Sequence, residues 1–104
     1  LLTTEAMADV VIAALTPLIK AMVDTPDHAV VECTTTSANR TLFVHIFVHN
    51  EDRGVVIGRD GKTAHALRTL LGGLCGKHQF RPVMEIVDDV DYLTLGIAAV
   101  FAVL

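Results

Sequence analysis

The sequence has no tryptophan, and aromatic residues make up only 5% of its 104 residues. Proteins that hold single strands on a platform of stacked rings need several exposed aromatic side chains, so this mode of nucleic-acid binding is excluded. The two cysteines, Cys33 and Cys75, are too few for the disulfide framework of a small secreted domain. We therefore expect a reducing, cytoplasmic compartment.

Long apolar runs are also missing. The nearest approach is Leu93–Leu104, which has twelve residues, whereas a helix needs about 20 to cross a bilayer. The N-terminus lacks the basic region of a signal peptide, so no membrane contact is expected. Apolar residues nevertheless make up 52% of the chain, which excludes disorder as its main state and predicts one domain with a modest core.

Basic residues are few, and the formal net charge is −4. A protein that coats nucleic acid through bulk charge needs the opposite sign. The charge is unevenly spread, however. Between Glu51 and Arg81 six lysines and arginines stand against three acidic residues, a net charge of +3, while the rest of the chain carries −7. One basic segment therefore lies within an acidic chain.

The first half of the chain predicts helices followed by a hairpin. Apolar spacing indicates a helix over residues 4–15, and Thr16-Pro17 is expected to begin a fresh or kinked helix that ends at Val23, with Leu18 facing inward. Residues 29–35 and 41–49 are rich in β-branched residues and predict two antiparallel strands. Ser37-Ala38-Asn39-Arg40 is the expected turn between them.

The second half predicts two helices and a closing strand. Asn50 is expected to cap a short helix over residues 51–57, and a second helix is expected over residues 62–74, with Gly58–Gly61 as the break between them. In the second helix Ala66, Leu67, Leu70 and Leu71 form the predicted apolar stripe. Residues 81–88 read as a strand. The predicted order from Pro17 is α-β-β-α-α-β.

The motif with a chemical meaning is Gly58-Arg59-Asp60-Gly61, followed by Lys62. Glycines at both ends of a short loop let the backbone lie close to a sugar-phosphate chain. The loop also opens a helix, whose free N–H groups and positive dipole end favour phosphate. Arg59 and Lys62 can neutralise phosphates. A G-x-x-G between two helices, with a basic residue after it, therefore indicates nucleic-acid binding.

The segment GVVIGRDGKTAHALRTLL, residues 54–71, resembles the core of a KH domain. The α-β-β-α-α-β order resembles the bacterial type II variant, an α+β fold with a three-stranded sheet packed on helices. The likeness is greatest to the small stand-alone KH proteins of the KhpA/YlqC family and spans residues 14–89. Residues 1–13 then form an N-terminal helical extension, and residues 90–104 form an apolar C-terminal tail.

The resemblance implies binding of about four single-stranded RNA nucleotides in a narrow groove. Carried onto this chain, Gly58, Arg59, Asp60 and Gly61 form the backbone clamp. Further phosphate contacts would come from Lys62, Arg53 and Arg68. Ile57 and Val56 would line the groove floor, unless they belong to the core.

The resemblance also implies partners and a role. Relatives pair with themselves or with a larger RNA-binding protein of the KhpB/Jag type. They are linked to post-transcriptional regulation, RNA chaperone activity and cell shape. No small-molecule substrate is implied.

Residues suited to catalysis or metal binding are not grouped in the sequence. His45 and His49 are four residues apart on a predicted strand, which separates them by about 13 Å and prevents them from sharing one ion. No nucleophile with a matching base is evident. Gly61-Lys62-Thr63 lacks the upstream glycine of a P-loop, since Val56 occupies that position. We expect no enzyme activity, metal or cofactor.

The strongest alternative is a protein–protein interaction (dimerisation) module with little RNA affinity of its own. Alternation along residues 41–49 puts Phe43, His45, Phe47 and His49 on one face of the sheet. If helices cover only the opposite face, these side chains are exposed, and exposed phenylalanines commonly mark a partner surface. The tail or the first helix could instead cover this face, within one chain or across a dimer.

Overall fold

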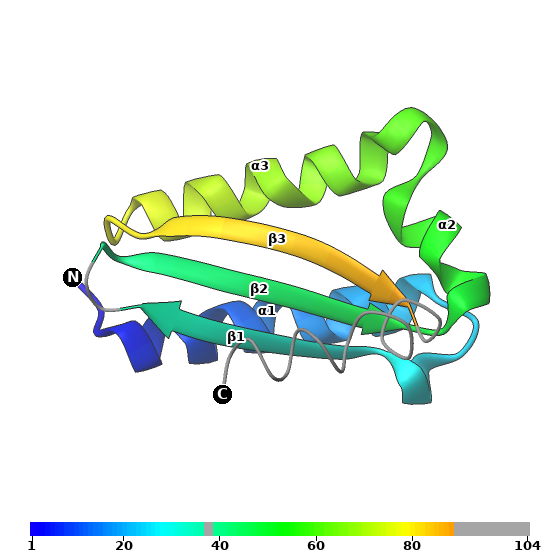
Figure 1. Cartoon of the computed structure of the whole chain (residues 1–104), viewed down its shortest axis with the longest axis horizontal. Helices are drawn as coiled ribbons and strands as arrows, with labels where there is room; N and C mark the ends of the chain where they lie inside the picture. The colour runs from blue at the N-terminus through cyan, green and yellow to red at the C-terminus, as the bar shows by residue number, and fades with distance from the viewer. Residues whose placement is uncertain (37–38, 89–104) are drawn as a thin grey trace.

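A computed structural model of the chain describes residues 1–36 and 39–88. It contains a long helix, a hairpin, two shorter helices and a last strand, in that order (Figure 1). These elements are α1 (Thr4–Met22), β1 (Val30–Thr36), β2 (Thr41–Val48), α2 (Arg53–Ile57), α3 (Lys62–Gly76) and β3 (Arg81–Asp88). The predicted order α-β-β-α-α-β is confirmed. The predicted turn at 37–40 lies partly, and the predicted tail wholly, outside the described residues.

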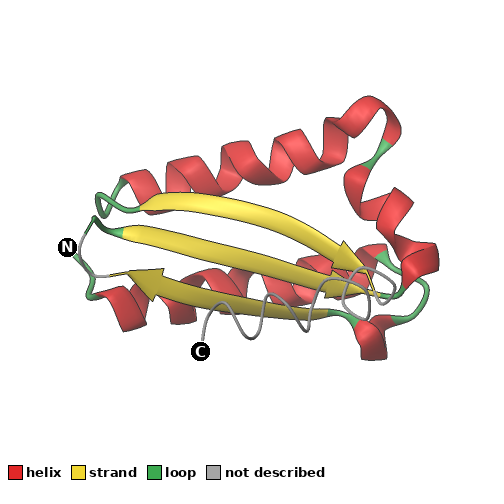
Figure 2. Ribbon diagram, viewed as in Figure 1, coloured by secondary structure: helices red, strands yellow, loops and turns green. Residues whose placement is uncertain are grey.

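The sheet has the strand order β1-β2-β3 and mixes two pairings. β1 and β2 form the predicted antiparallel hairpin, with Val31 opposite Ile46. β2 and β3 are parallel, with Ile46 opposite Ile86. A parallel neighbour requires a crossover connection, and α2 and α3 provide it. Figure 2 shows α1 running behind the sheet and α3 running along β3.

Helix α1 is continuous through Pro17, so a fresh helix beginning there, one of the two predicted alternatives, is wrong. Proline within a helix removes one hydrogen bond and costs about 3 kcal/mol. Leu15 and Ile19 lie before and after Pro17 on the same buried stripe, and their packing against the sheet outweighs this cost. The buried stripe is Met7, Val11, Leu15 and Ile19. Leu18, predicted to face inward, is 41% exposed.

The core lies between the sheet and the helices. On β2 the predicted alternation is confirmed, because its inward residues are all buried: Leu42, Val44, Ile46 and Val48. On α3 the predicted stripe is shifted. Leu67 and Leu71 are buried, but Leu70 is 63% exposed and Ala66 is also exposed, while Ala64 and Cys75 are buried instead. The helix continues through Gly72 and Gly73 to Gly76.

A buried carboxylate joins α2 to the chain between α1 and β1. Asp52 is only 2% exposed, and its two oxygens accept hydrogen bonds from the backbone N–H groups of Asp24 (3.1 Å) and Thr25 (3.0 Å). The turn before it is capped by His49, whose Nδ1 accepts from Glu51 N–H. The predicted Asn50 cap is therefore wrong: the capping side chain is the His49 imidazole, one residue earlier.

Arg40 joins the start of β2 to the turn before β3. Its guanidinium donates to the carbonyl oxygens of His78 (2.8 Å) and Gln79 (3.1 Å) and lies 4.0 Å above the Phe80 ring. Its own carbonyl accepts from Arg81 N–H. The Arg40 side chain therefore makes structural contacts within the fold.

Replacing Asp52 with alanine will leave two partly buried N–H groups without their acceptor. We expect the free energy of unfolding to fall by about 2–4 kcal/mol, measured from the urea midpoint at unchanged slope. Asp27→Ala, which removes an exposed acid from the same connection, is the control and should change stability by less than about 0.5 kcal/mol. Equal losses in the two variants would contradict the anchoring role of Asp52.

Candidate nucleic-acid interface

The G-x-x-G loop is a tight turn between α2 and α3. Gly58 ends α2 with φ +79°, and its N–H donates to the Gly54 carbonyl (2.8 Å). Asp60 and Gly61 also have positive φ, +57° and +72°. Gly61 N–H returns to the Gly58 carbonyl (3.1 Å), and α3 begins at the next residue. The loop therefore separates α2 from α3 within four residues, as the sequence predicted.

The two glycines of the loop have different surroundings. A Cβ on Gly58 would overlap the Thr63 side chain and come within 2.8 Å of the Thr63 backbone nitrogen. A Cβ on Gly61 would meet no heavy atom within 4 Å. The fold itself therefore requires glycine at 58. The space at 61 leaves the backbone open to an approaching molecule.

Two cations flank the open glycine. Arg59 and Lys62 are exposed, and within residues 1–36 and 39–88 neither side chain makes an ion pair or a hydrogen bond. Lys62 is also the first residue of α3, whose N-terminal end carries a partial positive charge. Asp60 is the single acidic residue of the loop, and it is exposed. The side chains nearest Gly61 in sequence therefore favour the binding of an anion at this loop.

The other predicted contacts do not all share this environment. The Arg53 guanidinium lies 3.9 Å from the Asp88 carboxylate, so this cation joins α2 to the end of β3. Val56 is fully buried and belongs to the core, whereas Ile57 is half-buried beside the loop. Of the two residues predicted to line the floor of the groove, only Ile57 is exposed enough to contact a ligand.

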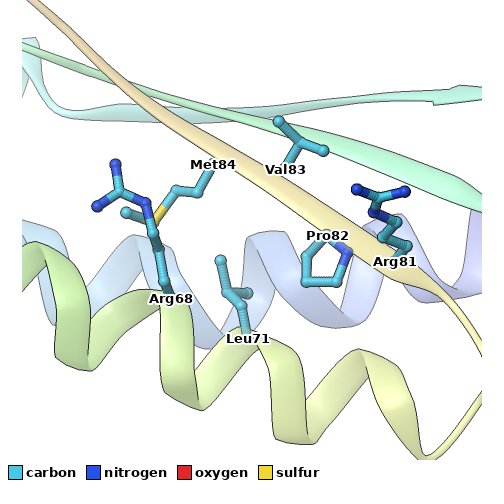
Figure 3. A pocket seen from close by; sticks show the side chains of 6 residues that line it. All are labelled: Arg68, Leu71, Arg81, Pro82, Val83 and Met84. Atoms are coloured by element: carbon cyan, nitrogen blue, oxygen red, sulfur yellow. The ribbon is translucent and has the colours of Figure 1, made fainter.

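A groove of about 270 Å³ runs between α3 and β3 (Figure 3). Leu71 and Met84 are buried at its base, and Arg68 and Arg81 are exposed on opposite walls. Pro82 and Val83 complete the lining. The sequence predicted Arg68 as a site residue but missed Arg81. The signal that could have identified Arg81 was a basic residue at the start of a predicted strand, within the segment that has a net charge of +3.

The β3 wall of the groove is also the edge of the sheet. In the part of the chain that the structure describes, β3 pairs with β2 alone. An edge strand leaves one row of backbone N–H and C=O groups for another molecule. The groove therefore combines an apolar base, two guanidinium groups and backbone donors and acceptors.

The two cysteines are not activated. Burial raises the pKa of Cys33 to about 11, with smaller contributions from Cys75 and Asp9, and burial also raises the pKa of Cys75. Both thiols are therefore protonated at neutral pH and are poor nucleophiles. Among the described residues no three His, Cys, Asp or Glu side chains are grouped to hold a metal ion. No helix within these residues is long and apolar enough to cross a membrane.

Comparison with known families gives a consistent result. A sequence model described as KhpA/KhpB, KH domain, matches residues 13–86. The chain belongs to this family. Its architecture is accordingly that of a type II KH domain, as predicted, and the KhpA/KhpB KH family is a family of RNA-binding domains and not of enzymes.

Relatives within the KhpA/KhpB family cover most of the chain. The RNA-binding protein KhpA of Mycobacterium tuberculosis (strain ATCC 25618 / H37Rv) is 46% identical over 71 residues, which are 68% of this chain and 86% of that protein. The RNA-binding protein KhpA of Streptomyces coelicolor is 42% identical over 80 residues, 77% of this chain and 94% of that protein. No solved structure matches the chain.

The different surroundings of the two glycines predict unequal effects on stability. Gly61→Ala should cost only about 1–2 kcal/mol, the penalty for a side chain in the left-handed region. Gly58→Ala should cost more, because its Cβ also overlaps Thr63. Thermal unfolding followed by circular dichroism measures both. A Gly58→Ala variant as stable as Gly61→Ala would show that the loop relaxes around the added methyl group.

Proposed function

We propose that the chain binds single-stranded RNA with the Gly58–Gly61 loop and the groove between α3 and β3. The observation that carries the proposal is the open backbone at Gly61 between two exposed cations, Arg59 and Lys62. Phosphates need close backbone approach and positive charge, and this loop offers both. The name of the relatives, RNA-binding protein KhpA, supports RNA as the ligand.

In this proposal the loop and the groove bind different parts of the RNA. The open backbone at Gly61 and the side chains of Arg59 and Lys62 hold the sugar-phosphate backbone, and bases lie in the groove against Leu71 and Met84. The edge of β3 donates to and accepts from base edges. Unpaired bases are required, because a duplex hides its base edges and faces. Arg53 contributes through its ion pair with Asp88, which joins α2 to the end of β3.

The cellular role follows from the family alone. We infer post-transcriptional regulation or RNA chaperone activity in the cytoplasm, with a link to cell shape. Pairing with a second copy or with a KhpB/Jag-type protein is part of the same proposal. The alternative, a dimerisation module with little RNA affinity, predicts a tight dimer and no measurable RNA binding.

The loop is tested by placing a negative charge at Gly61. Asp tolerates the left-handed region, and the space at 61 is open, so Gly61→Asp should remain folded. A carboxylate beside a phosphate should weaken binding of short random-sequence single-stranded RNA by roughly tenfold or more. Fluorescence anisotropy titration measures the affinity.

Gly61→Asn is the matched control, because it has the same shape and backbone preference without the charge. It fills the same space without the charge, so it should weaken binding clearly less than Gly61→Asp does. Equal weakening by Asn and Asp would point to backbone distortion and contradict the electrostatic account. A native chain that binds no RNA would overturn the proposed function as a whole.

The groove is tested by the salt dependence of Arg81→Ala. For single strands each neutralised phosphate adds about 0.7 to the slope of log affinity against log salt concentration. If Arg81 meets the RNA backbone, the variant should lose about 0.7 from this slope. Lys77→Ala, which removes an exposed cation directly after α3 and outside the groove lining, should leave the slope unchanged. An equal loss of slope in both variants would mean that a cation in the groove contributes no more to RNA binding than one outside it.

A further inference from the structure

The face of the sheet turned away from the helices has an ordered pattern across its three strands. The pairing register places Val30, Phe47 and Val87 in one cross-strand row. Two residues further along, the register gives a polar row of Glu32, His45 and Glu85. The next row is Thr34, Phe43 and Val83. Two rows with apolar side chains therefore flank one polar row.

The outer strands of these rows leave apolar surface in contact with solvent. Val30 is 45% exposed on β1 and Val83 is 36% exposed on β3. The described helices α1 and α3 pack on the opposite face, where Leu42, Val44 and Ile46 are buried. Apolar side chains gathered on one face, unlike scattered ones, mark a surface that another segment covers.

We propose that the segment Leu93–Leu104 of this chain covers this face. Ten of its twelve residues are Leu, Ile, Val, Phe or Ala, and the other two are Thr94 and Gly96. The family model ends at residue 86, so this segment lies beyond the shared domain, whereas nearly all of the face it would cover lies within it. The proposal does not depend on RNA binding.

The start of the segment is close to the first apolar row. β3 ends at Asp88, one residue after Val87, and four residues connect it to Leu93. Four residues reach up to about 13 Å when extended, enough to turn back over the sheet. Phe47 and Phe43 are four residues apart on β2, a separation of about 13 Å along the strand. A twelve-residue segment spans about 18 Å as a helix and more when extended, so it can cover both rows.

Attachment to the same chain favours this occupant over a second copy. A short linker gives an effective concentration in the millimolar range, far above a micromolar protein solution. The connection through Asp88 thus favours intramolecular packing.

The test uses the full chain with a nitroxide spin label in the segment. Ala98→Cys supplies the labelling site, because the raised pKa values of Cys33 and Cys75 slow their reaction with the reagent. We expect strong broadening of the amide NMR signals of Val30, Phe47 and Val83. The exposed side of α1, at Val10 and Ala14, should be spared. Equal, weak broadening everywhere would overturn the proposal.

A mixed sample identifies the occupant. When isotope-labelled native chain is mixed with unlabelled spin-labelled chain, intramolecular packing predicts no broadening of the sheet signals. Broadening in that sample would assign the face to a second copy and overturn the proposal. Val30→Glu in the spin-labelled chain should reduce the sheet broadening at least about twofold, since a charge in the apolar row opposes packing. Thr36→Glu, on the same face of β1 outside the rows, is the matched control and should leave it unchanged.

Discussion

The parallel pairing of β2 with β3 is the constraint on which the rest of the structure depends. Parallel neighbours cannot be joined by a hairpin, so the chain must leave the end of β2, cross the helical layer and return to the start of β3. That path contains α2, the G-x-x-G loop and α3. The same crossover sets α3 beside the free edge of β3, and the groove is the space between them (Figure 3).

The basic residues of the chain divide according to whether the fold already uses them. Arg40 is held by two carbonyl oxygens and a ring, and Arg53 lies against Asp88. Arg59 and Lys62 extend from the loop without such contacts in the described residues. A net charge of −4 is therefore compatible with a local anion site, because what matters is which cations remain available there.

Much of the fold could be predicted from the sequence because its strands carry strong local signals. The alternation along β2 and the bounds of β3 needed no tertiary information. Pro17 was misjudged because a local rule was outweighed by packing on both sides of it. On α3, Leu67 and Leu71 belong both to the predicted apolar stripe and to the one that is buried. Only contact with the sheet decides between the two stripes. The loop was recognisable as a motif, but the Arg53–Asp88 pair and Arg81 in the groove depend on residues brought together by the fold.

The unequal surroundings of Gly58 and Gly61 have a consequence for how sequences of this kind can vary. Glycine at 58 is demanded by the packing of Thr63, whereas the open space at 61 tolerates a side chain at a modest energetic cost. A library of variants sorted only for folded protein would therefore retain glycine more strictly at 58 than at 61. Sorting the same library for ligand capture would raise the share of glycine at 61. The difference between the two sorted populations would show which loop positions are constrained by folding and which by ligand binding.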